Sequence, residues 1–160
     1  MTTQTMPSPL YLEDLQPGEL HRSGGDPVSV TADGIKAFAR QFDPQPFHLD
    51  EATAALTFFK GLAASGWHTA AMTMKLLVEG GLPLAGGIIG AGVEEVRWPR
   101  PVRPGDQLRV ESEVLEVRPS RSRPGQGLAK IRTNTLNQNG EPVQVMTSNL
   151  VVPRRIIAET

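Results

Sequence analysis

A carboxylate and an imidazole lie five residues apart in a segment with two prolines, Phe42 to Asp50, whose sequence is FDPQPFHLD. Proline fixes its own φ and disfavours helix in the residue before it, so Asp43 and Gln45 should be extended and His48 should leave the turn in a defined direction. A histidine titrates near neutral pH, and a carboxylate beside it can orient a water molecule or exchange a proton. The segment therefore predicts an acid–base pair made of Asp43 and His48.

Addition of water to an activated double bond, or its removal, needs such a pair and one further group. One group takes a proton from water, another delivers a proton to the α-carbon, and the carbonyl oxygen must be stabilised while it gains negative charge. The first N–H groups of a helix can bind such an oxygen because they have no partner within the helix. Gly66, which follows Ala64 and Ser65 and begins a long apolar segment, is the best-placed candidate for this role.

Capping and periodicity predict the helices that would position these residues. Thr31 can cap a helix that leads into the turn and carries apolar residues at helical spacing, namely Ile35, Phe38, Ala39 and Phe42. An Ala-rich stretch from Glu51 to Phe59 predicts a shorter helix. Residues Gly66 to Glu79 are apolar on nearly all sides, which is typical of a buried helix, and a Gly-Gly-Leu-Pro sequence follows to end it.

The rest of the chain indicates an antiparallel sheet. A short strand is expected at Val28 to Val30, and turn sequences separate four longer ones, at Ile88 to Trp98, Gln107 to Arg118, Gly127 to Asn137 and Val143 to Val152. This is an α+β plan in which the sheet wraps a buried central helix at about residues 66–79. With no repeat and no low-complexity linker, residues 1–160 should form a single domain, with residues 1–15 as a loose N-terminal tail.

Composition narrows the class of protein. The chain has no cysteine, which excludes disulfides, thiol catalysis and thiolate metal sites and fits a cytoplasmic location. With 16 basic and 17 acidic residues the formal net charge is −1, so the bulk charge does not point to nucleic acid or to an anionic membrane. We see no signal-peptide pattern at the N-terminus and no apolar segment near the ~20 residues that span a bilayer. We therefore expect a soluble, cytoplasmic protein that binds neither nucleic acid nor membranes.

The turn resembles the signature D-x-N-P-x-H of the MaoC-like family of (R)-specific enoyl-CoA hydratases and dehydratases, which have the hot-dog fold. Gln45 stands where the signature has Asn. The Ser65-Gly66 pair at the start of the apolar helix is similar to the family's helix start. The segment Pro101 to Leu108, PVRPGDQL, is similar to the family's P-V-x-x-G-D-x-L, and NQNGE from Asn137 is similar to its final hairpin. The resemblance covers roughly Val28 to Val152.

This resemblance implies an enzyme of the lyase class. It would reversibly hydrate a trans-2-enoyl thioester, an acyl-CoA of fatty acid metabolism, to a (3R)-hydroxyacyl thioester. Asp43 and His48 would be the catalytic dyad, the Gly66 amide would bind the thioester carbonyl, and Ser65 and Gln45 would join it in binding the substrate. No metal or cofactor is expected, since coenzyme A is part of the substrate. Hot-dog domains generally pair through their sheets, so we expect a homodimer or higher homo-oligomer.

Two other functions stay open. A hot-dog acyl-CoA thioesterase would use a carboxylate to direct water at the thioester carbonyl, more often from the central helix, where Glu79 at the far end is the only acidic residue. A non-catalytic subunit that binds acyl thioesters or assists assembly is the other, because Gln45 replaces Asn and Met74 stands where some hydratases have an assisting serine. The turn could also be only structural, with His48 buried and bonded to Asp50 or to the backbone.

Three residues of the apolar helix favour structural roles. His68 follows Trp67, and in a buried helix it is expected to be a core histidine with satisfied hydrogen bonds. Met72 and Met74 are expected in the core, where flexible thioethers fill irregular space.

Three further patterns are weaker. Asp50 next to the Asp43 and His48 pair suggests a metal site, but no HxH or HExxH spacing supplies another ligand. The basic run Arg118 to Gly125 is more typical of a solvated hairpin turn than of a phosphate-binding loop. The glycines from Gly86 to Gly92 precede a strand rather than a helix, so they do not form a dinucleotide-binding loop.

Overall fold

The sheet comes from the long alternating segments in the second half of the chain. The computed structural model describes residues 8–155. It confirms the four predicted strands, which are β3 (Ile89–Arg97), β4 (Gln107–Pro119), β5 (Gln126–Leu136) and β6 (Pro142–Pro153). All pairs are antiparallel in the order β1-β4-β5-β6-β3, with the short β1 (Leu20–Arg22) at one edge and β2 (Val28–Ser29) also paired with β4. Buried and more exposed side chains alternate along β5, so one face of the sheet lines the core.

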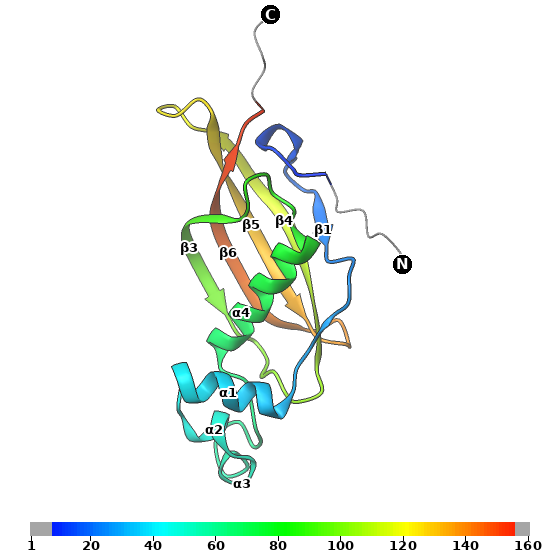
Figure 1. The fold of residues 1–160 in the computed structure, drawn as a ribbon, viewed down its shortest axis with the longest axis vertical. Coiled ribbons are helices and arrows are strands. Elements are labelled where there is room, and N and C mark those ends of the chain that lie inside the picture. Colours follow the sequence, from blue (N-terminus) through cyan, green and yellow to red (C-terminus); the bar gives the residue numbers. More distant parts are fainter. Residues whose placement is uncertain (1–7, 156–160) are drawn as a thin grey trace, which may run out of the picture.

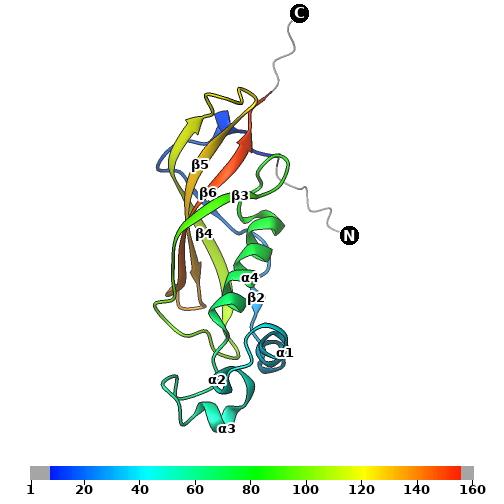
Figure 2. The same cartoon turned by 90° about the vertical axis from the view of Figure 1, so that its left-hand side faces the viewer.

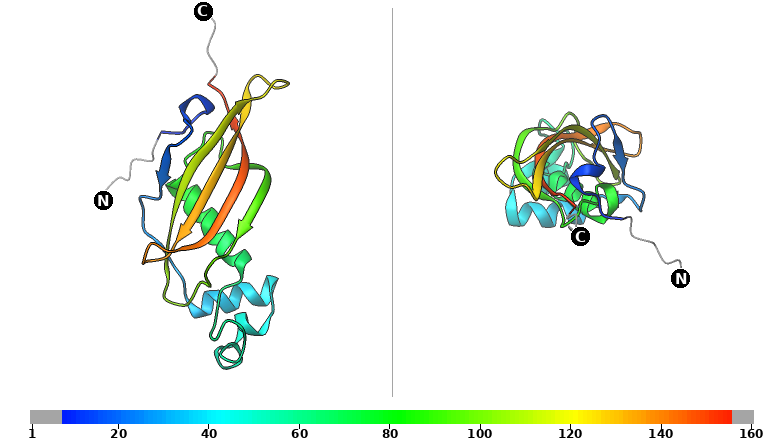
Figure 3. Two further views of the ribbon diagram at one scale, coloured as in Figure 1. Left: turned by 180° about the vertical axis from the view of Figure 1, so that it is seen from behind. Right: turned by 90° about the horizontal axis from the view of Figure 1, so that it is seen from above.

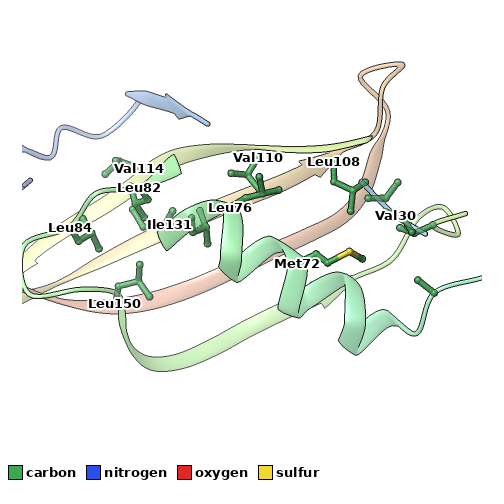
Figure 4. Close-up of a cluster of buried hydrophobic side chains, with 14 of the residues drawn as sticks. Val30, Met72, Leu76, Leu82, Leu84, Leu108, Val110, Val114, Ile131 and Leu150 are labelled. Carbon is green, nitrogen blue, oxygen red and sulfur yellow. The ribbon is translucent and has the colours of Figure 1, made fainter. Parts of the chain in front are cut away.

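Helix α4 (Gly66–Leu76) lies along the concave face of the sheet, which curves around it (Figures 1 and 3). Met72 and Leu76 of this helix pack in the apolar core with Leu108, Val110 and Ile131 of the sheet (Figure 4). The helix continues as a π-helical turn, η2 (Leu77–Gly81), which contains Gly80 at φ 128°. The predicted plan, an antiparallel sheet wrapped around a central helix, is therefore confirmed.

The outer face of α4 is exposed, so the expectation of a helix buried on all sides is wrong. Trp67 and Met74 of α4 are 61 and 42 % exposed, and Val78 of the following turn η2 is 61 % exposed. Met72 is buried as predicted, but Met74 is not a core residue. The reason is geometric, because the sheet covers only one side of the helix (Figure 2). An apolar sequence without a polar face indicates that a helix avoids water, but not that its own chain covers it.

Three helices at one end of the sheet carry the turn. Thr31 caps α1 (Ala32–Phe42) as predicted, accepting a hydrogen bond from the Gly34 amide. Two short helices follow, α2 (Pro46–Leu49) and α3 (Glu51–Ala54). Helix α2 was not predicted, although it begins with Pro46 and proline is favoured at the first position of a helix.

The helix predicted from Glu51 to Phe59 ends early, at Ala54. The Thr57 hydroxyl donates to the Ala54 carbonyl, which is the kind of local bond that competes with helix. Phe58 is 91 % exposed, so a longer helix would gain no burial there.

The start of the described chain packs onto the domain. Leu10 forms a bridge with Leu84, and Leu12 and Leu15, at either end of the 3-10 turn η1 (Leu12–Asp14), are buried in the core. Residues 8–15 are therefore not the loose tail that was expected, while residues 1–7 lie outside the described chain. None of the helices within residues 8–155 has the length and apolar character needed to cross a bilayer.

Candidate active site

The turn after α1 brings the predicted acid–base pair together. The Asp43 amide closes α1 by donating to the Ala39 carbonyl, at 2.9 Å. Gln45 is extended, as expected before a proline, and α2 then carries His48 back toward Asp43. The imidazole Nε2 lies 3.2 Å from Asp43 Oδ2. A carboxylate and an imidazole at this distance can pass a proton between them.

A backbone carbonyl fixes the orientation of the His48 ring. His48 is 4 % exposed, and its Nδ1 lies 2.5 Å from the Ala63 carbonyl oxygen. A carbonyl only accepts hydrogen bonds, so Nδ1 carries hydrogen and Nε2 is the nitrogen that faces Asp43. The Ala63 amide in turn donates to the Phe47 carbonyl, which holds the turn against the segment before α4. His48 is thus buried and bonded to the backbone, as the structural alternative expected, but its other nitrogen faces Asp43 and not Asp50, whose carboxylate caps α3 through Thr53.

Asp43 is surrounded by donors. Burial raises the pKa of this carboxyl. Hydrogen bonds from Ser65 and Gln45 and the neighbouring His48 lower the pKa by more than burial raises it, so the net pKa is below its ordinary value. Gln45 Nε2 lies 2.5 Å from Asp43 Oδ1. Asp43 is therefore a carboxylate at neutral pH. Ser65 and Gln45, both predicted as site residues, contact the dyad rather than stand apart from it.

The start of α4 faces the same space. Ser65 caps the helix by accepting from the Trp67 amide at 3.3 Å, and Gly66 is the first helical residue. Its N–H has no acceptor within the helix. Gly66 also has to be a glycine, because a Cβ there would lie only 2.6 to 2.8 Å from three ring atoms of Trp98.

A pocket of about 860 Å³ joins these groups. Asp43, Gln45, His48 and Gly66 line it together with five aromatic side chains, which are Phe47, Phe58, Phe59, Trp67 and Trp98. Basic residues lie at the same pocket, namely Lys60, Arg100 and Arg103. Arg103 donates to the Leu62 and Phe59 carbonyls and so joins the loop after β3 to the segment before α4.

Sequence reasoning did not identify Trp98 and Arg100 as residues that line the pocket. Trp98 was predicted as the end of a strand, and Arg100 was predicted in the Pro-rich turn that leads to the next strand, whereas both follow β3 and line the pocket. The available signal was the Trp-Pro-Arg-Pro sequence itself, in which an aromatic and a basic side chain sit on stiff backbone.

The structure contradicts the prediction for His68. His68 is not a satisfied core histidine, because its ring is only half-buried and stacks on Phe38 with centroids 4.7 Å apart. Its Nδ1 has no hydrogen-bond partner among residues 8–155. Burial, and then the charge of His48, lowers the pKa of His68. Asp50 does not join the dyad, and in the described part of the chain no cluster of three ligating side chains could hold a metal ion.

The basic run from Arg118 lies at the β4–β5 hairpin, at the opposite end of the sheet from α1 and α2 (Figure 1). It lines a separate hollow of about 720 Å³. The predicted solvated hairpin turn is confirmed, because residues 121–125 are exposed between the two paired strands. The hairpin is remote from the dyad, so it carries no part of the chemistry of this pocket.

Comparison with known proteins identifies relatives of the chain. The family described as MaoC like domain matches residues 18–135. The crystal structure of a MaoC-like dehydratase from Rhodospirillum rubrum is 57 % identical, with a TM-score of 0.88 over 92 % of this chain and 99 % of that one. The unliganded (R)-hydratase PhaJ1 from Pseudomonas aeruginosa is 30 % identical, with a TM-score of 0.69 over 94 % and 92 % of the two chains.

A further relative, the uncharacterised protein YdeM of Bacillus subtilis, is 35 % identical over 125 residues, which are 78 % of this chain and 86 % of YdeM. The family match spans well over half of the chain and includes the turn, the start of α4 and the segment after β3. With its antiparallel sheet curved around a central helix, the chain belongs to the MaoC-like dehydratase domain family and has the hot-dog fold.

Proposed function

We propose that this protein is a hydro-lyase that reversibly hydrates a trans-2-enoyl thioester, an acyl-CoA, to a (3R)-hydroxyacyl thioester. The observation that carries the proposal is the contact of 3.2 Å between His48 Nε2 and Asp43 Oδ2 in a pocket that also contains the first residue of α4. A relative named an (R)-hydratase, 30 % identical over nearly the whole chain, supports the same reaction class.

The dyad can move one proton from water to carbon. His48 Nε2 accepts a proton as the water oxygen bonds to C3 of the enoyl group. The electron pair of the double bond moves toward the thioester, and the Gly66 N–H stabilises the negative charge on the carbonyl oxygen. Asp43, ionised because its pKa is lowered, orients the water, takes the proton from His48 and delivers it to C2. Water is consumed and no proton is left over, so the reaction needs no cofactor.

The composition of the pocket fits a thioester substrate. Aromatic side chains supply apolar surface for the acyl group and the pantetheine arm. Lys60 and Arg100 at the pocket would favour the negative charges of a coenzyme A or of a phosphopantetheine carrier. We favour coenzyme A as the carrier.

A panel of trans-2-enoyl-CoA thioesters of graded length tests the proposal. Hydration appears as loss of the absorbance of the conjugated thioester, and thioester hydrolysis appears as free thiol. We expect hydration without thiol release. Thiol release would favour a thioesterase instead, but Glu79 is exposed, forms an ion pair with Lys75 and does not line the pocket. Thermal protection by the thioesters without conversion would favour a non-catalytic binding subunit.

We also propose that the chain forms a homodimer or higher homo-oligomer. Strand β3 is an edge of the sheet, and Ile89 and Val93 on it are 51 and 57 % exposed. Met74 of α4 and Val93 line the same cleft of about 360 Å³. The apolar first half of this edge strand, next to the exposed apolar face of α4, is a surface that a second copy can cover. Sedimentation should give a dimer or larger, and Val93→Lys should shift it toward monomer. A monomeric wild type would contradict the proposal.

A further inference from the structure

Trp98 is held in the pocket by an interaction from behind. The indole Nε1 donates to Oε1 of Gln144 at 3.0 Å, and the ring lies directly on Gly66. Trp67 meets it edge to face, with ring centroids 5.3 Å apart. Trp98 is 41 % exposed, although its neighbours on the sheet side are buried. The indole is therefore fixed on one side and borders the pocket on the other.

Gln144 belongs to a buried polar cluster between α4 and the sheet. It is fully buried on β6, and its Nε2 lies 3.3 Å from Thr73 Oγ1 on α4. Thr73 donates its hydroxyl hydrogen to the Thr69 carbonyl at 2.9 Å, and its oxygen also lies 2.5 Å from Thr135 Oγ1. The Thr73 oxygen thus accepts from Gln144 and Thr135. Since an indole N–H only donates, the amide of Gln144 has a single orientation that satisfies both neighbours.

The burial of the Gln144 amide is energetically unfavourable unless its hydrogen bonds compensate for it. An apolar side chain of similar size would fill the same space. The one partner of Gln144 that reaches the pocket is Trp98. This points to a role for Gln144 at the pocket rather than in stability alone.

The position of the Trp98 indole determines how it would restrict a bound acyl group. Gly66, under the ring, is the residue whose N–H would bind the thioester carbonyl. Trp98 is the side chain that lies on Gly66, so an acyl group bound there would meet the indole, and the space behind the indole is filled by Gln144 and Thr73. An acyl group bound at Gly66 could therefore not extend through that side of the pocket.

We propose that Trp98 is the wall that limits the length of the acyl group, and that Gln144 is a positioning residue that fixes this wall through the indole N–H. The proposal rests on the proposed function in naming an acyl thioester as the ligand. It adds a preference for short acyl chains.

Binding of saturated thioesters tests the wall without turnover. Butanoyl-CoA and octanoyl-CoA have no double bond to hydrate, and their Kd values can be measured by calorimetry on the full chain. Wild type should bind butanoyl-CoA more tightly. Trp98→Ala should shift the ratio of the two Kd values toward octanoyl-CoA by about tenfold or more, because each methylene that becomes buried improves affinity several-fold. Trp98→Phe, which keeps an aromatic ring should the alanine variant fail to fold, should shift it by about threefold in the same direction.

Gln144→Met tests the positioning role. It keeps the volume, removes the acceptor and should shift the Kd ratio by about threefold, with a changed emission maximum of Trp98 measured in a Trp67→Phe background. In a Trp98→Phe background, which has no N–H, Gln144→Met should shift the ratio no further. Ser112→Ala is the matched control, because it removes another buried hydrogen bond, to Thr133, that does not touch Trp98.

The outcomes separate the two proposals. If wild type binds neither thioester, both the proposed function and the wall are wrong. If wild type binds both but Trp98→Ala and Trp98→Phe leave the ratio unchanged, the wall is wrong and the proposed function stands. If Gln144→Met acts equally with and without the indole N–H, or no more than Ser112→Ala, Gln144 is not a positioning residue.

Discussion

The turn that carries Asp43 and His48 and the wall opposite it, where Trp98 lies on Gly66, enclose the same pocket but are held by different kinds of contact. The turn is a short continuous segment in which Asp43 contacts Gln45 and His48, and one nearby segment, around Ala63 and Ser65, holds it in place. The wall joins α4, the loop after β3 and, through Gln144, strand β6. Changes in the turn should therefore alter chemistry and leave the fold intact, whereas changes in the wall should alter both.

The largest effect is expected from Asp43→Asn. Asparagine has the shape of aspartate but cannot take a proton from His48, so turnover of an enoyl-CoA should fall by about 10³-fold, a typical contribution of acid–base catalysis. The unfolding temperature should stay within a few degrees of wild type, because the turn keeps its backbone bonds.

Asp50→Asn is the matched control for this change. Its carboxylate caps α3 and lies outside the pocket, so turnover should be nearly unchanged. Unchanged loss of the conjugated-thioester absorbance in Asp43→Asn would contradict both the mechanism and the contrast between the two regions.

The wall should respond to Gly66→Ala in both stability and activity. The new methyl would lie 2.6 Å from an indole atom, and the indole cannot move aside without losing its bond to Gln144. Overpacking of this kind costs about 1–3 kcal/mol, which thermal unfolding would measure. Turnover should fall as well, since the helix start that faces the pocket is displaced.

Gly24→Ala provides the comparison, because a Cβ there meets nothing within 4 Å and should leave stability unchanged. Combining Gly66→Ala with Trp98→Ala should remove most of the penalty. A penalty that persists without the indole would show that Trp98 is not what requires a glycine at this position.

The same contrast explains what could be predicted from sequence. Strands β3 to β6 and the approach of His48 to Asp43 depend on alternation and on spacing within a few residues, and both were predicted. The contact of Trp98 with Gln144 joins distant segments, and no local pattern encodes it. Met74 was misplaced for a related reason, since an apolar helix face indicates burial without showing which chain would cover it.

Gln45→Ala should have a smaller effect, confined to the turn. The hydrogen bond from Gln45 helps to lower the pKa of Asp43, so its loss should raise that pKa toward the ordinary value. The rate falls where Asp43 becomes protonated, so the acid limb of the pH–rate profile should move to higher pH. At neutral pH we expect a loss of about tenfold or less, because a hydrogen bond to a charged group is worth about 1.5 kcal/mol at the lower end of its range.

Gln41→Ala, which changes an exposed residue of α1 outside the pocket, serves as the control and should leave the profile in place. An acid limb that moves to lower pH in Gln45→Ala would contradict the assignment of that limb to Asp43.

The smallest effect is expected where the two regions meet, at the stack of Phe38 in α1 on His68 in α4. Because burial lowers the folded-state pKa of His68 below 6.5, the unfolded chain binds the proton more readily. Protonation of His68 therefore lowers the stability of the fold as the pH falls below that value, and this contribution is absent well above it. His68→Leu and His68→Phe should therefore have a higher unfolding temperature relative to wild type at pH 5.5 than at pH 7.5. A difference that is equal at both pH values would mean that packing against Phe38, and not protonation, determines what His68 contributes to this contact.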